Sequence, residues 1–374
     1  MSLVLTRTQN MRANSNLDKY ELRPSRYGAL NAFIEQSNDP NGILTPELKE
    51  KARVSIGSTL ETPVIDYDGN ITIGNTRDVL IGDSENTSRM VQITFATYAW
   101  GFTVTPAAYM NNEISIQRDF EKKMMKYIYA FAKALDSAAL SVLAADKTQV
   151  LSNPLLYNFS GSTLAATFNQ RENLLSDLEV MMGADDFFGR LDIVGDAGVE
   201  SLLKKLAQLD FNNIVNKRNE YSGKTFHFTN SIATDADLFA QGYAIEKGSI
   251  GMMTRFERDC LLGTRSADGH EWSIVTLPML GIPCGAYFYD SVGNYSGIVG
   301  DATADMTRTR KEHYGFAVDV AFLTAYNSSV YLDQDTKRPS PILAFTIDNA
   351  GAQYGMPVKV VNDENSPVYM TSVQ

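Results

Sequence analysis

The clearest pattern in the chain is a long segment in which apolar side chains recur every three or four positions. Between about residues 112 and 145 the apolar positions are Phe120, Met124, Tyr127, Ile128, Phe131, Leu135, Ala138 and Val142. The opposite face carries Arg118, Glu121, Lys122, Lys126, Lys133 and Asp136. This periodicity predicts one amphipathic helix with its apolar stripe toward a core. At a rise of about 1.5 Å per residue the helix would be roughly 50 Å long, well above the usual length.

A ribbon of strands is predicted before this helix. Val64–Tyr67, the turn Asp68–Asn70 and Ile71–Ile73 have the pattern of a hairpin. Residues 90–104 predict a long strand, and the apolar phase changes near residues 96–99, which indicates a bulge or a sharp twist. Because an isolated two-stranded ribbon is marginal in water, we expect it to lie on a neighbouring molecule.

The first 60 or so residues are polar and weakly periodic. Thr45, Pro46 and Glu47 predict a short helix that ends near Val54, because proline fits the first helical position. The rest of the segment has too little apolar content to build a core alone. We therefore expect an extended arm that becomes ordered against other subunits.

The remainder of the chain predicts a mixed region of helices and strands, followed by long strands. Helices are predicted at residues 170–182, 197–209 and 235–241, and strands at 191–194, 225–230, 272–277, 286–289, 314–326 and 340–347. A polar turn at residues 332–337 separates the last two strands. The whole pattern is that of an α+β fold.

The composition indicates a folded chain with two or three packed units. Of 374 residues, 44% are apolar and 21% are charged, which provides enough apolar material for a sizeable core. Lys and Arg number 33 against 44 Asp and Glu, and the formal charge is −11. No run of basic residues predicts a face that grips nucleic acid. An acidic chain can still enclose nucleic acid, because a container should not bind its cargo tightly.

Cysteine use and the N-terminal residues predict a protein kept in a reducing cytoplasm. Cys260 and Cys284 do not form a CxxC pair, so we expect both to be free thiols. The first residues lack an apolar run of signal-peptide length. No stretch approaches the ~18–20 continuous apolar residues of a membrane helix.

Motifs for nucleotide or metal chemistry are weak. Ser222–Thr225 resembles the end of a phosphate-binding loop, but that pattern needs glycine where this chain has Arg218. The histidines are His227, His270 and His313, and His270 is not followed by a second histidine four residues later. We expect structural or surface roles for all three, and no zinc centre or His-based triad.

Three pairs of carboxylates remain as candidates for acid–base chemistry or cation binding. They are Asp66/Asp68, Asp185/Asp186 and Asp333/Asp335. The first pair fits a hairpin turn and the second fits the exit of a helix, while the third is compatible with a calcium ion in a loop between strands. No Gly-x-Ser-x-Gly elbow is present. We expect no enzyme activity, no cofactor and no bound metal.

The order of these elements resembles the major capsid protein fold of tailed bacteriophages. That fold has an N-terminal arm, an extended loop, a peripheral domain with a spine helix, and an axial domain. Local similarity to the family occurs at Thr105–Asn112, Leu135–Leu143, Leu280–Pro283, Gly300–Asp301, Tyr314–Val320 and Ser340–Phe345. Cys284 stands where valine is commoner in the family. The resemblance covers roughly residues 60–347.

The resemblance implies a division of the chain and a function. The expected parts are an N-terminal arm (1–61), an extended β-hairpin loop (62–110), a peripheral domain with the spine helix (111–164), an axial α/β domain (165–300), and peripheral return strands with a C-terminal tail (301–374). The implied function is self-assembly into pentamers and hexamers that form an icosahedral shell around double-stranded phage DNA. The implied partners are other copies of the chain and scaffolding, portal and decoration proteins. The implied location is the virion capsid, assembled in the host bacterial cytoplasm without a membrane.

The polar tip of the extended loop offers candidates for ion pairs between subunits, although a solvated polar loop would have the same composition. They are Arg77, Asp78, Asp83, Glu85 and Arg89. Residues 62–112 contain no lysine, so we do not expect the covalent cross-link that some relatives make through a loop lysine. Ala325, Tyr326 and Asn327 occupy positions that are often basic in the family, so the ion pairs made there are in question.

Three other classes of protein are alternatives. An encapsulin-like nanocompartment would have the same fold, but the long N-terminal segment disfavours it. Another phage structural part, such as a tail or baseplate protein, is disfavoured by the long helix, because a tail tube is expected to be mostly strand. An unrecognised α/β hydrolase or transferase would need clustered acids or a nucleophile, which the sequence does not display.

Overall fold

The computed structural model describes most of the chain, and the structural statements below refer to those residues. They are residues 3–13, 27–40, 42–55, 57, 59–65, 88–109, 112–147, 151, 155–184, 187–209, 220–221, 223–233, 235, 237–257, 260, 263, 269–295, 307–325 and 340–349. The helices are α1 (Leu3–Ala13), α2 (Gly28–Ser37), α3 (Pro46–Val54), α4 (Glu113–Asp146), α5 (Arg171–Ala184) and α6 (Ala197–Leu209), with short 3₁₀ turns η3 (Pro106–Tyr109) and η4 (Phe168–Gln170). The strands are β1 (Thr59–Ile65), β2 (Ser88–Thr94), β3 (Ala96–Val104), β4 (Asn158–Ser160), β5 (Thr163–Ala166), β6 (Leu191–Gly195), β7 (Glu220–Tyr221), β8 (Lys224–Phe228), β9 (Leu238–Glu246), β10 (Ile250–Arg255), β11 (Glu271–Thr276), β12 (Pro283–Tyr295), β13 (Thr307–Thr324) and β14 (Ile342–Asp348). The predicted α+β class is confirmed.

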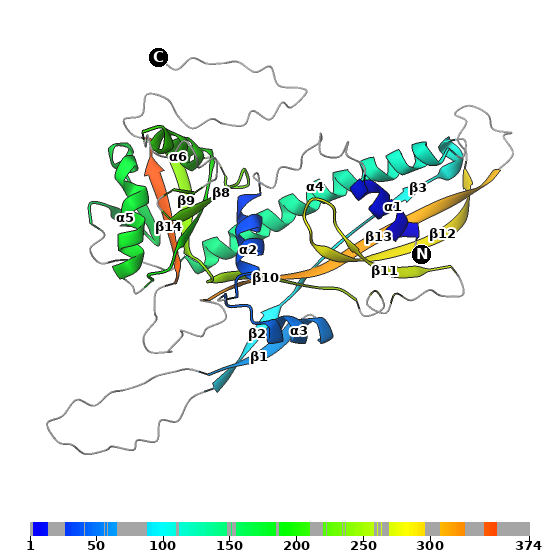
Figure 1. Ribbon diagram of the computed structural model, residues 1–374, viewed down its shortest axis with the longest axis horizontal. Coiled ribbons are helices and arrows are strands. Elements are labelled where there is room, and N and C mark those ends of the chain that lie inside the picture. The colour runs from blue at the N-terminus through cyan, green and yellow to red at the C-terminus, as the bar shows by residue number, and fades with distance from the viewer. Residues whose placement is uncertain are drawn as a thin grey trace, which may run out of the picture.

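A long helix and a long strand run side by side through the molecule (Figure 1). α4 begins after Asn112, whose side-chain oxygen accepts the backbone N–H of Ile114 at 3.0 Å and caps the helix. β13 pairs with β12 and β10, and through residues 312–320 it pairs with β3. These strands and β11 form a five-stranded sheet in the order β10-β13-β12-β11, with β3 added to β13.

The predicted apolar stripe of α4 is confirmed along most of the helix. Its buried positions include Phe120, Met124, Ile128, Phe131 and Leu135. Rings from the sheet pack between them: Phe102 lies 5.4 Å from Phe120, and Trp100 lies 4.8 Å from Phe131, between ring centroids. By length and composition alone α4 could cross a membrane. Its apolar stripe is instead buried against the five-stranded sheet, so α4 is the core helix of this unit.

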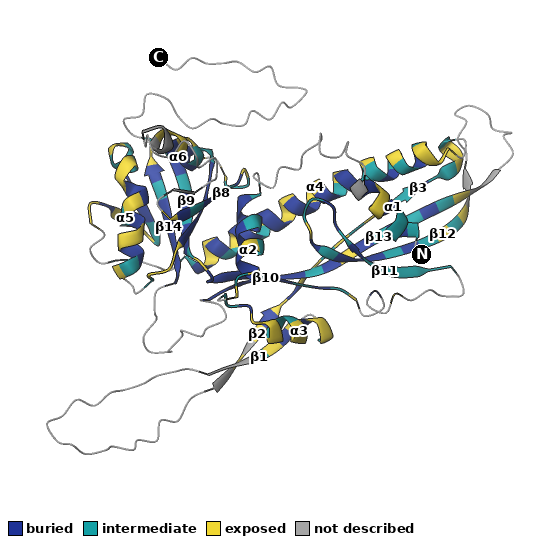
Figure 2. Ribbon diagram, in the orientation of Figure 1, coloured by how far each residue is buried: buried dark blue, intermediate teal, exposed yellow. Residues whose placement is uncertain are grey.

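A second, seven-stranded sheet has the order β4-β5-β14-β9-β6-β8-β7. All five residues of β6 are buried. Ile193 belongs to a core with α5 and α6, whereas the next residue, Val194, packs with α2 and the end of α4. Because successive side chains of a strand point to opposite faces, the sheet is covered on both sides at β6. Figure 2 marks many residues of this sheet as buried.

The N-terminal segment differs from the extended arm that the sequence predicted. α1 and α2 are helices that pack on the body of their own chain. Leu30 and Phe33 in α2 are fully buried. The apolar pattern was weak because α2 is only ten residues long and buries Gly28 and Ala29 as well. The predicted helix α3 is confirmed, and the hydroxyl of its cap Thr45 accepts a backbone N–H at 3.2 Å.

The prediction that Asp136 lies on the solvated face of α4 is also wrong. Its carboxylate is fully buried and accepts the backbone N–H of Leu30 at 3.0 Å and the hydroxyl of Thr229. Gln36 makes a similar junction nearby, since its side chain donates to Asp192 at 2.8 Å and accepts the N–H of Gly248 at 2.9 Å. Gln36 also accepts the N–H of Ile250 in β10 at 3.1 Å. These buried hydrogen bonds join α2 to α4 and to both sheets.

The helix predicted at residues 235–241 is wrong, because β9 begins at Leu238. Asp235 looks like a helix cap in the sequence, but its side chain accepts the N–H of Asp237 at 3.0 Å in a local turn. β9 then pairs with β14 on one side and β6 on the other. A central place in the sheet outweighs the local helix propensity of these residues.

The single long strand predicted at residues 90–104 is two strands with a break at Phe95. β2 pairs only with β1, whereas β3 pairs with β13 in the five-stranded sheet. The irregularity predicted near residues 96–99 is therefore present at Phe95, one residue before that range. At this point the chain leaves the ribbon and enters the body.

The two sheets draw strands from parts of the chain that the sequence-based division kept apart. β14 follows the long return strand β13 in sequence, yet it pairs with β5 and β9 in the seven-stranded sheet. β11 and β12 lie within the segment expected to be axial, yet they pair beside β13. Pairing between distant segments decides sheet membership, and local patterns do not contain that information.

Candidate functional site at the root of the ribbon

The ribbon of β1 and β2 leaves the body of the molecule beside α3 (Figure 1). Its antiparallel register runs from Thr59 opposite Thr94 to Ile65 opposite Ser88. At the root, buried side chains of the ribbon pack with α3, β10 and β13. They are Leu60, Ile93 and Phe95 against Leu44, Ala52, Met253, Ala321 and Leu323.

One buried arginine fixes this root to the five-stranded sheet. Arg255, at the end of β10, donates from Nε to the Oδ2 atom of Asp319 at 3.1 Å. Its Nη1 atom donates to the hydroxyl of Ser55 at 3.0 Å, and Nη2 donates to the carbonyl oxygen of Gly57. The guanidinium carbon also lies 4.1 Å from the ring centroid of Phe95. Arg255 therefore contacts the chain both before β1, at Ser55 and Gly57, and after β2, at Phe95.

The sequence offered no local signal for this anchor. Arg255 and Asp319 are 64 residues apart and lie on neighbouring strands, β10 and β13. Arg255 is 6% exposed and is surrounded by three oxygen acceptors, so its charge is compensated in a buried place. From the sequence alone, a single arginine and a single aspartate in separate strands are expected at the surface. Their contact becomes evident only once the pairing of the two strands is known.

The five residues proposed from the sequence for self-association lie mostly outside the described residues. They are Arg77, Asp78, Asp83, Glu85 and Arg89. The backbone of Arg89 lies in β2, opposite Val64 in β1. The turn at residues 68–70, the strand at 71–73 and the carboxylate pairs Asp66/Asp68, Asp185/Asp186 and Asp333/Asp335 are also outside the described part.

A second buried network ties α1 to the sheet. Arg7 donates to the hydroxyl of Tyr314 at 2.8 Å and to the Oε2 atom of Glu312 at 3.1 Å. The Tyr314 hydroxyl donates to the same carboxylate oxygen at 2.6 Å. Burial and the neighbouring carboxylate raise the pKa of the Tyr314 phenol, so it stays a donor. The network is structural, because every group in it has a partner within the chain.

The ionisable groups of the described residues do not form a catalytic set. Burial lowers the pKa of His227, and burial raises the pKa of the Cys284 thiol to about 12. Lys224, from the rejected phosphate-loop motif, is buried and pairs with Glu179 at 2.8 Å. Among these residues no three metal-ligating side chains come together. Cys260 and Cys284 are both buried and are not joined in a disulfide.

The uncovered face of the five-stranded sheet carries a shallow apolar groove of ≈ 620 Å³. Its floor is made of small residues on three neighbouring strands, including Ala99, Gly285 and Gly315. Trp272 and Tyr287 form an aromatic wall, with ring centroids 5.3 Å apart. Among the described residues that line the groove, Glu257 is the one charged side chain, and they offer no set of polar groups that would orient a small substrate.

Comparisons with known proteins find similar folds only. No model of a protein family matches the chain, and no curated protein matches it. Among solved structures, the chain is similar to one of Mycobacterium phage Cain, with 13% identity, a TM-score of 0.45, and coverage of 93% of this chain and 98% of that one. A structure of Mycobacterium phage Che8 has 10% identity, a TM-score of 0.43 and coverage of 81% and 88%. The capsid of Ralstonia phage GP4 has 9% identity, a TM-score of 0.40 and coverage of 79% and 84%. With identities this low and TM-scores below 0.5, these likenesses do not assign a function.

Proposed function

We propose that this chain is a major capsid protein of a tailed bacteriophage. In this role it assembles with itself into pentamers and hexamers that tile an icosahedral shell. One observation carries the proposal. A two-stranded ribbon projects from the body, and the buried Arg255 anchor joins its root to the five-stranded sheet. A ribbon with no core of its own is marginal in water, so it needs a surface on another molecule.

The proposal assigns a role to each part of the chain. The five-stranded sheet with α4 serves as the peripheral domain, and the seven-stranded unit serves as the axial domain around which capsomers close. The ribbon lies across the next subunit, where Arg77, Asp78, Asp83, Glu85 and Arg89 make ion pairs between copies. Contacts of this kind are heterologous and close by rotation.

The acidic balance of the chain supports a container that does not grip its contents. A formal charge of −11 disfavours tight contacts with the phosphate backbone. The shell encloses double-stranded DNA without reading its sequence. Scaffolding, portal and decoration proteins are the expected partners, assembly takes place in the host cytoplasm, and the chain acts without enzymatic chemistry.

A nanocompartment shell that encloses proteins is the second candidate, because it needs the same anchored ribbon and the same closure. The two differ in contents and in partners. A tail or baseplate role has less support, because the chain contains the 34-residue helix α4 whereas a tail tube is expected to be mostly strand.

Recombinant expression tests the proposal directly. The protein is produced alone and together with the products of its neighbouring genes, and examined by size-exclusion chromatography and negative-stain electron microscopy. Shells, polyheads or capsomer rings are expected. Nuclease-protected DNA in particles assembled during infection distinguishes a capsid from a nanocompartment. A stable monomer under both expression conditions would rule out a shell protein.

A further inference from the structure

The exposed face of α4 differs from the mixed-charge face that the sequence predicted. Asp136 is fully buried, and Glu121 is half-buried and accepts a hydrogen bond from Gln117 at 2.9 Å. From residue 118 to the end of the helix, the charged residues of α4 that are exposed are all basic. They are Arg118, Lys122, Lys126 and Lys133, which we call the basic stripe.

The basic stripe runs along one side of the helix. At about 100° per residue its side chains lie within an arc of about 80°, and at about 1.5 Å per residue they span roughly 22 Å. Figure 2 shows exposed positions recurring along α4. Four positive charges therefore stand together on a chain whose formal charge is −11.

The charges of the basic stripe have no partner among the described residues. None of its side chains forms a hydrogen bond or an ion pair with them. The neighbouring lysine of α4 differs, because Lys123 lies 2.6 Å from the carboxylate of Asp119 and donates to the carbonyl oxygen of Thr103 at 2.8 Å. The basic stripe therefore creates a local positive potential that attracts a negatively charged partner.

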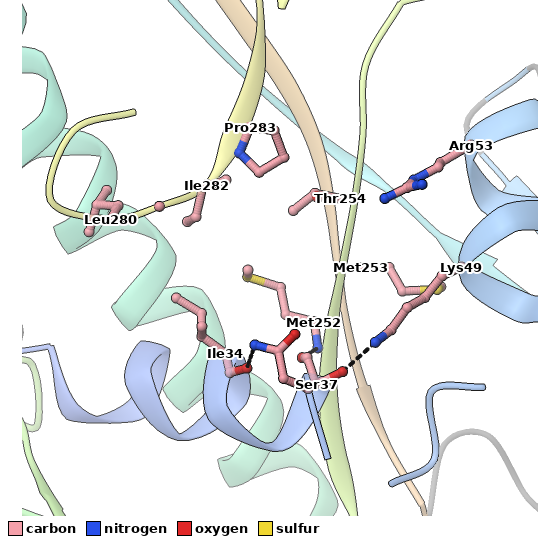
Figure 3. Close-up of a pocket in the computed structure, with 12 residues that line it drawn as sticks. Ile34, Ser37, Lys49, Arg53, Met252, Met253, Thr254, Leu280, Ile282 and Pro283 are labelled. Atoms are coloured by element: carbon pink, nitrogen blue, oxygen red, sulfur yellow. Dashed lines mark hydrogen bonds between the residues drawn. The ribbon is translucent and has the colours of Figure 1, made fainter. Parts of the chain in front are cut away.

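A second basic pair, on α3, has its partners within the chain. Lys49 and Arg53 line a pocket of ≈ 240 Å³ beside β10 (Figure 3). Lys49 donates to the carbonyl oxygen of Ser37, and Arg53 lies 3.6 Å from Glu50. Contacts of this kind within the described chain are what the side chains of the basic stripe lack.

The surroundings of the basic stripe favour phosphate groups over a protein surface. The exposed neighbours on this helix are small, at Ala130, Ala134 and Ser137, and Tyr129 is the one exposed aromatic residue of α4. A protein interface needs a desolvated core with apolar or aromatic anchors. The backbone of a nucleic acid needs only positive charges along its path.

We propose that the basic stripe contacts the phosphate backbone of double-stranded DNA, and that this side of α4 faces the interior of the shell. Contacts to phosphates alone carry no sequence information. A stripe of this length positions DNA against the wall without the tight grip that the acidic balance of the chain disfavours. The inference rests on the proposed shell function and specifies which face of the chain meets the DNA.

The first test measures DNA binding by the unassembled subunit. Fluorescence anisotropy with a labelled DNA duplex of arbitrary sequence should show binding at low salt. The logarithm of the affinity should fall with the logarithm of the salt concentration with a slope of about −3, as expected for up to four phosphate contacts. Lys122→Glu with Lys126→Glu should weaken binding at low salt by about tenfold or more and make this slope shallower. A wild type that does not bind the duplex at low salt would overturn the proposal.

The matched control changes the net charge by the same amount on another surface. Lys204→Glu with Lys205→Glu alters α6, where these lysines lie 2.6 Å from Glu200 and 3.0 Å from Glu172. This variant should bind the duplex almost as the wild type does. Equal losses in the two double variants would show that net charge alone matters, and would overturn the basic stripe as the binding face. Both variants should melt close to the wild type, because the substituted side chains are exposed.

The second test locates the contact inside a particle. Lys126→Cys is coupled to a benzophenone maleimide in particles filled during infection, where the buried Cys260 and Cys284 are shielded from the reagent. Ultraviolet light should then join the chain to DNA. Crosslinks to another protein instead of DNA would assign the basic stripe to an acidic protein partner and overturn the proposal.

The remaining outcomes separate this contact from the shell function. Wild-type shells that assemble but give no DNA crosslink from position 126 would overturn the contact while self-assembly stands. A wild type that binds the duplex through the basic stripe but never assembles would overturn the shell and the interior placement, and the DNA contact would stand.

Discussion

The centre of the seven-stranded sheet is covered on both faces, whereas β11, β12 and the first part of β13 are covered on one. In β6 every side chain is buried, and alternate residues enter two different cores. In β12, Phe288 is buried against α4 while its neighbours Tyr287 and Tyr289 are half-exposed on the other face. A sheet with two covered faces is complete within one chain. A sheet with one open face and a projecting ribbon leaves surface for partners.

The largest expected effect is in the two-sided sheet. Phe345→Ala in β14 removes a ring that is 1% exposed and in contact with Gly242. The cavity and the lost burial should lower the free energy of unfolding by about 3–5 kcal/mol. Urea unfolding of the unassembled subunit measures this. A loss below about 1 kcal/mol would show that this sheet is not packed on both faces.

The next effect depends on pH and on Asp196, which begins α6. Its carboxylate accepts the N–H of Val199 at 3.0 Å and that of Gln241 at 2.9 Å. Burial nevertheless raises its pKa from 3.8 to about 6, so the folded state holds the proton more tightly than the unfolded state. The stability from this group is fully present below about pH 4 and is lost as the pH rises through about 6. The size is roughly 3 kcal/mol at most.

Asp196→Asn is the variant that isolates this effect. Asparagine cannot accept both backbone bonds, so it carries a constant cost, but it does not titrate. Between pH 4 and 7 the wild type should lose stability relative to the variant in urea unfolding. If the free energies of unfolding of the two proteins changed in parallel over that pH range, Asp196 would have the same pKa in the folded and unfolded states, contrary to this prediction.

A moderate effect is expected at the root of the ribbon. Arg255→Met removes the ion pair with Asp319 and the hydrogen bonds to Ser55 and Gly57. Because Asp319 is partly exposed, we expect a loss of about 2 kcal/mol. Amide hydrogen exchange should accelerate in β1 and β2 and stay unchanged in β6. Lys51→Met, which loses only an exposed bond to the Glu61 carbonyl, is the control and should leave exchange almost unaltered.

The smallest effect is expected on the open face. Tyr289 stacks on His313 with ring centroids 4.4 Å apart, and Tyr289→Ala should cost about 1 kcal/mol. The same urea measurement compares it with Phe345→Ala. Equal losses in the two variants would mean that this face is covered as well as the seven-stranded sheet.

The candidate site was only partly predictable. The ribbon and the long helix were found from the sequence, because period-two and period-3.6 patterns are local. The Arg255 anchor was not found, because it requires β10, β13 and the residues that follow α3 to be brought together.

The sequence by itself determined the elements whose signals lie within about one helix or strand. α4 and its buried stripe, the capped helix α3, α5 and α6, and the strands at 191–194 and 314–326 follow from spacing and capping alone. Tertiary structure decided the rest. It made β9 a strand, buried Asp136, split the long strand at Phe95, and placed β14 in the seven-stranded sheet. The physical reason is that strand pairing and burial depend on partners far away in the chain, whose contribution outweighs local propensity.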